Sequence, residues 1–279
     1  MNWEIWLIGV LGMLCLTLCY LVIILNKKSK ELSKENTAFD EANEEDYRRD
    51  FVANVSHELR TPVSIIKGFS ETLLEDFENI KEKKRKDFLE KINRNANRLH
   101  SLIEDLMLLA QFDGNPHSLK LQTVELTTTI REVVEECKSR WNPQELKVLL
   151  DLPNFEVPIT VDPQKIISVF ENLLENAFNH AKELSRITIR LKIIEKQTMA
   201  FCEIEDDGQT TIAPAEIAKL FERFYRVDKS RSRARGGTGL GLSIVKDIIE
   251  AHNGQIMAKQ SKNGGLIFTF KLPLQAKDS

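Results

Sequence analysis

The sequence has no excess of positive charge. Its 39 lysine and arginine residues are outnumbered by 42 aspartate and glutamate residues, so the formal net charge is −3. Proteins that bind nucleic acids normally present a basic patch to the phosphate backbone. The charge balance therefore argues against a dedicated nucleic-acid-binding function, and we expect no nucleic-acid partner.

Cysteine is also scarce. Of the four cysteines, Cys15 and Cys19 lie in an apolar stretch, and Cys137 and Cys202 are far apart. No pair has the spacing of a metal site or of a disulfide framework. This usage is typical of a protein whose globular part lies in a reducing cytosol.

One long segment has no charged residue. Residues 5–25 form an uncharged run of 21 residues, about the length that a helix needs to cross a bilayer at ~1.5 Å per residue. Only Glu4 precedes the run, whereas Lys27, Lys28, Lys30 and Lys34 follow it. By the positive-inside rule, the C-terminal side is cytoplasmic. We therefore expect a single-pass protein of the cell membrane, with residues 1–4 outside and the remaining domains cytoplasmic.

A cleaved signal peptide is the alternative for this segment. The residues before the run include no lysine or arginine, and the run is long for the apolar part of a signal peptide. We therefore expect a permanent anchor. Residues 26–46 are polar, of mixed charge and free of proline and glycine, which predicts a helical linker.

Two amphipathic helices are predicted next. Apolar residues recur at near 3.6-residue spacing over residues 47–77 and again over 87–112, with a charged turn at 78–86. The first stripe is Phe51, Val55, Leu59, Ile66, Phe69 and Leu73, and the second is Leu89, Ile92, Ala96, Leu99, Ile103, Leu106 and Ala110. Two helices cannot bury both stripes alone. Residues 47–113 are therefore expected to form a helical-hairpin dimerisation domain, which makes a four-helix bundle in a homodimer.

The remaining sequence alternates between strand and helix patterns. Helices are predicted at 127–141, 163–181 and 238–252. Strands are predicted at 124–126, 148–152, 159–161, 187–194, 199–204, 255–258 and 266–272, with 187–194 and 199–204 as a hairpin. We expect one α+β domain over residues 119–275.

Four segments, in this order, resemble the motifs of sensor histidine kinases. Residues 51–62 (FVANVSHELRTP) resemble the H box, 172–180 (NLLENAFNH) the N box, 221–226 (FERFYR) the F box and 237–242 (GTGLGL) the second glycine box. The resemblance is closest to kinases of the phosphate-regulon sensor type. It implies a HisKA hairpin followed by a GHKL-type α/β sandwich that binds ATP with Mg²⁺, and a protein-histidine kinase activity (EC 2.7.13.3). The implied partners are a second copy and the receiver domain of a response regulator.

His57 is the phosphoacceptor that the resemblance implies. A neutral imidazole is a good nucleophile when one nitrogen is free and an acceptor holds the other. Glu58 could take or orient that proton, although a plain solvated charge is the alternative. Thr61 matches the position that orients water when the family dephosphorylates its response regulator.

The N box places Asn172, Asn176, Asn179 and His180 on one helix face, at i, i+4 and i+7/i+8. Asparagine is a poor residue for a helix interior, so the row indicates a site. Mg²⁺ prefers hard oxygen ligands, and the resemblance implies that Asn176 supplies one. Asn172 stands where related ATP hydrolases have the Glu that activates water, which favours transfer over hydrolysis. Asn179 and His180 replace the usual Lys and Tyr.

The second glycine box comprises Gly237, Thr238, Gly239, Leu240 and Gly241 and opens an apolar helix. Its free N–H groups suit a triphosphate. Residues 207–235 are expected to form a lid over ATP that Phe221, Phe224 and Tyr225 pin to the domain. A basic run in this lid, from Lys229 to Arg235, is either a solvated face or a phosphate contact.

The first glycine box departs from the family. Asp206 and Gly208 match, and the Asp206 carboxylate can accept from the adenine amino group. A second glycine is missing, and Thr210 and Thr211 occupy the segment with one extra residue. Threonine disfavours positive φ and would crowd the base, so weakened ATP binding is expected.

Three functions stay open. The leading one is an active kinase with an additional phosphatase activity, and the runner-up is a degenerate kinase that acts mainly as a response-regulator phosphatase. The third is a non-enzymatic membrane scaffold. The stimulus is expected through the bilayer, an accessory protein or the linker.

Overall fold

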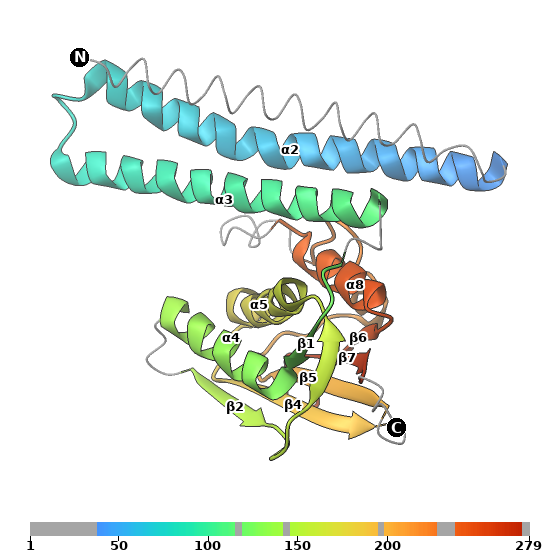
Figure 1. Cartoon of the computed structure of the whole chain (residues 1–279). Coiled ribbons are helices and arrows are strands. Elements are labelled where there is room, and N and C mark those ends of the chain that lie inside the picture. Colours follow the sequence, from blue (N-terminus) through green and yellow to red (C-terminus); the bar gives the residue numbers. More distant parts are fainter. Residues whose placement is uncertain (1–37, 115–118, 142–145, 195–197, 228–237, 275–279) are drawn as a thin grey trace. The chain divides into compact units, whose positions relative to one another are not determined.

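The computed structural model describes residues 38–114, 119–141, 146–194, 198–227 and 238–274 (Figure 1). The predicted membrane segment, residues 5–25, lies outside them, as does the first part of the linker. No helix among the described residues is both long and apolar enough to cross a membrane.

Two long helices form the N-terminal part, α2 (Ala38–Asp76) and α3 (Glu82–Gly114) (Figure 1). Helix α2 continues through Pro62. The turn predicted at 78–86 is too long, because α3 already begins at Glu82. The charged residues from Glu82 onward are good helix formers, and a glutamate in the first turn interacts favourably with the helix dipole.

The apolar stripe of α3 is partly different from the predicted one. Leu99 and Leu106 are buried as predicted, but Leu89 is 55% exposed and Phe88 is buried in its place. The other buried residues of α3 are Leu102 and Leu109. Near the turn, Phe88 joins Leu73 and Ile80 in a small core, with Phe69 at 4.8 Å between ring centroids. Apolar residues also occur one position after several of the buried ones. The predicted stripe combined residues from both sets.

A five-stranded sheet forms the centre of the second part. Its order is β2 (Lys147–Asp151), β4 (Arg186–Ile194), β5 (Met199–Asp206), β7 (Leu266–Pro273) and β6 (Gln255–Gln260). Strands β2 and β4 are parallel and the other neighbours antiparallel, which confirms the predicted hairpin of β4 and β5. A separate ribbon pairs β1 (Gln122–Glu125) with β3 (Pro158–Val161).

Three helices cover one face of this sheet: α4 (Leu126–Trp141), α5 (Pro163–His180) and α8 (Gly241–Ala251) (Figure 1). Phe170 of α5 and Phe270 of β7 are fully buried between the layers, 5.6 Å apart between ring centroids. The structure also contains a short helix, α6 (Pro214–Ile217), that the sequence analysis missed. The layers form the α/β sandwich that was predicted.

Asp162 and His252 fix the ends of α5 and α8. The Asp162 side chain caps α5 by accepting hydrogen bonds from the backbone N–H groups of Gln164 and Lys165. The backbone N–H of Asp162 in turn donates to Nε2 of buried His252 at 2.9 Å, so Nδ1 of that ring donates to the carbonyl of Ile248. These bonds join the N-terminal end of α5, which carries the N box, to the C-terminal end of α8, which begins in the second glycine box.

Candidate functional site

His57 lies on the exposed surface of α2. Glu58 beside it is half-buried, and Thr61 one turn later donates its hydroxyl to the carbonyl of His57 at 3.3 Å. Pro62 has no N–H group, so it makes no hydrogen bond within the helix to the carbonyl of Glu58. The side chain of His57 is exposed to solvent, and Glu58 follows it in the sequence.

The N box residues lie along one side of α5, beside its buried residues such as Leu173 and Ala177. Asn172, Asn176 and Asn179 are half-buried and His180 is exposed. The amide of Asn172 donates to the carbonyl of Ser168 at 2.9 Å. Its Oδ1 lies so close to Gly241 that a Cβ there would overlap it. The glycine thus lets the first turn of α8 approach the row of asparagines.

The glycine turn before α8 is held by the F box. Gly239 has φ 77°, a left-handed conformation, and its carbonyl accepts from the backbone N–H of Phe224 at 2.8 Å. A Cβ on Gly239 would lie 3.0 Å from Cα of Phe224. The helix predicted from residue 238 consequently begins at Gly241.

No side chain caps the first turn of α8 among the described residues. Its first backbone N–H groups therefore remain suited to an anion. Thr238 accepts from the backbone N–H of Leu240 at 3.2 Å, and Phe221 contacts Phe268 of the sheet edge-on. Gly237 and the basic run of the lid lie outside the described residues.

Three successive carboxylates, Glu205, Asp206 and Asp207, lie at the end of strand β5 and have different hydrogen-bond partners. Asp207 accepts from the hydroxyl of Ser185 at 2.6 Å and from the backbone N–H groups of Ser185 and Arg186. Burial opposes ionisation here, but these donors lower the pKa of Asp207. Asp207 therefore fixes the start of β4.

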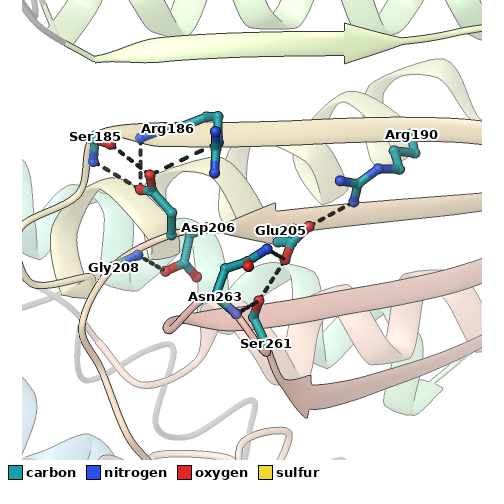
Figure 2. Close-up of polar contacts among 9 residues, drawn as sticks. Ser185, Arg186, Arg190, Glu205, Asp206, Gly208, Ser261 and Asn263 are labelled. Atoms are coloured by element: carbon teal, nitrogen blue, oxygen red, sulfur yellow. Dashed lines mark hydrogen bonds and ion pairs between the residues drawn. The ribbon is translucent and has the colours of Figure 1, made fainter.

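Glu205 lies on the face of the sheet away from the helices. It accepts from Arg190 at 2.8 Å, from the Ser261 hydroxyl at 2.5 Å and from the Asn263 amide at 3.3 Å (Figure 2). Burial again opposes ionisation, but Ser261, Arg190 and Asn263 together lower the pKa of Glu205. This carboxylate therefore joins β4 to the turn between β6 and β7.

Asp206, between them, is 4% exposed. Its Oδ1 accepts from the backbone N–H of Gly208 at 3.0 Å and its Oδ2 from that of Leu266 at 2.9 Å. Burial raises the pKa of Asp206 even though these two donors favour the ionised form. A carboxylate has about four lone-pair sites. Asp206 can therefore accept a further hydrogen bond, such as one from an exocyclic amino group of a base.

The altered segment at 208–212 is held in place without the second glycine. The backbone N–H of Gln209 donates to the carbonyl of Lys182 at 2.7 Å, and the hydroxyl of Thr210 accepts from the N–H of Lys182. Among the described non-glycine residues, only Glu183, Phe224 and Asn253 have positive φ. Thr210 and Thr211 therefore do not adopt the positive φ that a glycine would permit here, and weakened ATP binding stays a prediction.

The turn between β6 and β7 also belongs to this site, although it was not predicted. Gly265 has φ 66°, and a Cβ there would overlap Asp206. The sequence Asn263-Gly264-Gly265 is a typical hairpin signal. No sequence pattern, however, showed that this turn lies against Asp206.

Comparisons with known proteins agree with both parts of the chain. Residues 47–115 match the model of the His Kinase A (phospho-acceptor) domain. Residues 161–276 match that of the histidine kinase-, DNA gyrase B- and HSP90-like ATPase. The chain belongs to the sensor histidine kinases. The chain thus combines a phospho-acceptor hairpin with an ATPase-like domain, as the motifs predicted.

Relatives with similar sequences include two WalK proteins. The sensor histidine kinase WalK of Bacillus subtilis is 33% identical over 227 residues, which are 81% of this chain and 36% of the relative. The sensor protein kinase WalK of Staphylococcus aureus is 32% identical over 228 residues, 82% of this chain and 54% of the relative. The chain therefore spans between about a third and a half of the length of these relatives.

Solved structures of histidine kinases share the fold. The Acinetobacter baumannii histidine kinase AdeS aligns with a TM-score of 0.60 and 24% identity over 78% of this sensor histidine kinase and 98% of that chain. Histidine kinase ThkA, in complex with the response regulator protein TrrA, aligns with a TM-score of 0.63 and 22% identity over 88% and 70% of the two chains.

Proposed function

We propose that this chain is an ATP-dependent protein-histidine kinase that phosphorylates His57. The observation that carries the proposal is the pairing, in one chain, of a phospho-acceptor hairpin with His57 exposed and an ATPase-like domain. In that domain the row of asparagines on α5 lies against the uncapped first turn of α8. Phosphoryl transfer requires mainly that donor and acceptor be positioned and that the developing charge be stabilised.

In the proposed reaction, a ring nitrogen of His57 attacks the γ-phosphorus of ATP. A nitrogen–phosphorus bond forms, the bond from the γ-phosphorus to the bridging oxygen breaks, and ADP leaves. Glu58 accepts a hydrogen bond from the other ring nitrogen, which keeps the attacking nitrogen free of a proton, and it takes that proton as the nitrogen–phosphorus bond forms, so the ring ends neutral. Its half-buried position beside the exposed His57 supports this role.

ATP would be held at two ends. At the adenine end, defined by residues 206–212 and the turn at 260–266, the spare acceptor capacity of Asp206 would receive the amino group of adenine. At the phosphate end, defined by residues 238–241 with Asn172 and Asn176, the N–H groups of α8 would bind triphosphate oxygens. The close approach of Gly241 to Asn172 supports this assignment. From the resemblance, Asn179, His180, Phe221 and Phe224 would complete the nucleotide site.

Mg²⁺ fits the phosphate end through an amide oxygen. Asn176 offers one hard oxygen from α5, and Mg²⁺ commonly combines one or two protein ligands with water and phosphate oxygens. The ion would neutralise charge on the triphosphate when bound. Asn172 is engaged with Ser168 and carries no carboxylate, so no base is offered there to activate water. Transfer to His57 is therefore favoured over hydrolysis.

The whole protein would act as a membrane-anchored homodimer. The uncharged run at 5–25, followed by lysines, supports one membrane helix with residues 26–46 as linker. Exposed apolar residues on the hairpin (Leu74, Phe77, Leu89 and Met107) support pairing of residues 47–113 with a second copy as a four-helix bundle. Residues 119–275 would form the ATP-binding domain.

Dimerisation can be tested on the hairpin alone. Residues 43–118 should have twice the monomer mass in light scattering at tens of micromolar. Leu89→Glu should lower that mass. A monomeric wild-type hairpin would contradict the proposal.

The phosphoryl group would then pass from His57 to an aspartate of a response regulator. The relative ThkA was solved with such a regulator, TrrA. Thr61, one turn from His57, would orient water when the same protein dephosphorylates its regulator. Its hydroxyl bond to the carbonyl of His57 keeps it beside the phosphoacceptor.

Autophosphorylation with labelled ATP tests the proposal. The full chain should gain label that is acid-labile and alkali-stable, and His57→Gln should abolish it. His100→Gln is the matched control, because His100 is also an exposed histidine of the hairpin, and it should label normally. Label that persists in His57→Gln would contradict the proposal. No label in the wild type, even at high ATP, would favour the phosphatase alternative.

A further inference from the structure

Gln260 makes three hydrogen bonds with the main chain at the adenine end. Its Oε1 accepts from the backbone N–H of Ile212 at 3.1 Å, and its Nε2 donates to the carbonyl of Thr210 at 2.7 Å and to that of Gly265 at 2.6 Å. One side-chain amide thus joins the altered segment, residues 208–212, to the turn between β6 and β7. The Glu205 and Asp206 carboxylates reach the same turn, but neither contacts Thr210 or Ile212.

The position of this turn determines the position of Asp206. The backbone N–H of Leu266 holds one carboxylate oxygen, and only the absence of a Cβ on Gly265 leaves room for the other. A Cβ on Gly264 would lie 2.8 Å from the carbonyl oxygen of Gly208. The turn therefore packs directly on residues 206–208, so that a shift of the turn moves the carboxylate.

The outer side of the turn is held independently. Glu205 accepts from Ser261 and Asn263, on the face of the sheet opposite to the helices (Figure 2). With this anchor in place, the removal of Gln260 should loosen the segment at 210–212 without unfolding the hairpin of β6 and β7. Gln260 is thus expected to affect the position of residues 210–212, whereas Glu205 keeps the hairpin of β6 and β7 folded.

We propose that Gln260 is a positioning residue for the adenine base, and that it replaces the restraint lost with the second glycine. The proposal rests on the proposed function, in which adenine lies against Asp206. It makes Gln260 important for ATP affinity and for base selectivity, because both depend on where Asp206 and residues 210–212 stand. The transfer of the phosphoryl group occurs at the other end of ATP and does not depend on it.

Gln260→Met tests this inference, because methionine keeps the length of the side chain but makes none of the three hydrogen bonds. Titration calorimetry of the full chain with MgATP should show a Kd raised about ten-fold. The KM for ATP should rise equally, whereas the autophosphorylation rate at saturating ATP should stay unchanged within about two-fold. Gln255→Met is the matched control, since Gln255 is an exposed glutamine of the same strand. It should leave the Kd unchanged.

Gln260→Glu tests the donor role separately. A carboxylate has the shape of the amide but would place an acceptor oxygen against the carbonyls of Thr210 and Gly265. It should weaken ATP binding at least as much as methionine does. Hydrogen exchange should also accelerate at the amide of Ile212 in both variants and not in Gln255→Met.

The outcomes are distinct. A wild type that binds no ATP would overturn the proposed function itself. If the wild type binds ATP and Gln260→Met or Gln260→Glu binds it equally well, the inference about Gln260 is wrong. A loss of the saturated rate with an unchanged Kd would likewise overturn it.

Discussion

At the phosphate end of the candidate nucleotide site, the contacts that shape the site come from glycines and backbone groups. At the adenine end they come from two side chains, Asp206 and Gln260, that hold backbone groups of distant segments. The first kind of construction leaves a sequence motif, because glycine adopts the left-handed φ at Gly239 without steric cost and leaves room for the contact at Gly241. Asp206 also belongs to a motif, but Gln260 does not, because any two segments can be joined by an amide.

The difference also separates two functions within one site. The phosphate end faces the bond that is broken, so damage there should reduce the rate of transfer. The adenine end contributes binding energy away from the reacting atoms, so damage there should reduce occupancy. Variants at either end that change the transfer rate and the affinity for ATP together would contradict this division.

The largest effect is expected for Asn176→Asp at the phosphate end. A carboxylate in place of the amide changes the charge beside Mg²⁺ and the triphosphate and should reduce the saturated autophosphorylation rate at least about 100-fold. Gln164→Glu makes the same chemical change at the exposed first turn of α5 and should keep the full rate. Initial rates of labelling at saturating ATP would measure both. A near-normal rate in Asn176→Asp would remove this residue from the site.

A smaller effect is expected for Gly241→Ala. The added Cβ would overlap Oδ1 of Asn172, so α8 must move away from α5 or the asparagine must leave Ser168. We expect a loss of about 1–3 kcal/mol in unfolding free energy, measured by denaturation in urea, and a lower autophosphorylation rate at saturating ATP. Gly68→Ala is the control, since no other atom lies within 4 Å of the Cβ it would add. It should stabilise helix α2 by about 0.5–1 kcal/mol. Equal stability of the two variants would show that the helices are not in close contact.

The smallest effect on ATP is expected far from both ends, at Glu125. Burial opposes ionisation, but hydrogen bonds from Thr128, Val157 and Thr127 lower the pKa of Glu125 from 4.5 to about 2. The stabilisation is fully present above about pH 4.5 and is lost as the pH falls toward 2. Glu125→Gln should therefore cost about 1–2 kcal/mol at neutral pH, after allowance for solvent screening, and progressively less in acid.

Unfolding midpoints from pH 7 down to pH 3 would measure this dependence. Glu135→Gln serves as the control, because Glu135 is an exposed glutamate of α4 paired with Lys138. It should change stability by less than about 0.5 kcal/mol. Neither variant should change the Kd for ATP. A pH-independent difference between wild type and Glu125→Gln would contradict the explanation.

The fold was largely predictable from the sequence, because the spacing of apolar residues and the positions of turn-forming residues indicate local structure. The hairpin of β4 and β5 and helix α5 lie where the pattern placed them, within about two residues. The start of α3 was wrong because a run of charged residues reads equally well as a turn or as an exposed helix. Leu89 was wrong because two apolar tracks lie side by side on α3, and a single sequence does not say which of them is covered.

The candidate site was predictable where its residues belong to a local sequence motif. Gly239 and Gly241 stood out for this reason. Asp206 was placed by its motif, but the turn that holds it was missed, since Gly265 and Leu266 are sixty residues away along the chain. The threonines at 210 and 211 were expected to disfavour the positive φ of the missing glycine and to crowd the base. In the structure this segment follows another path, and the amide of Gln260 holds it through a hydrogen bond to the carbonyl of Thr210.

The autophosphorylation rate as a function of ATP concentration, carried to saturation, tests the central claim most directly. Two variants are compared in parallel, Asp206→Asn at the adenine end and Asn176→Asp at the phosphate end. We predict that Asp206→Asn raises the KM for ATP about ten-fold or more but recovers most of the wild-type rate at saturation, whereas Asn176→Asp stays slow at every concentration. If both variants lose the saturated rate to the same extent, the division of the site into an end for affinity and an end for chemistry is contradicted.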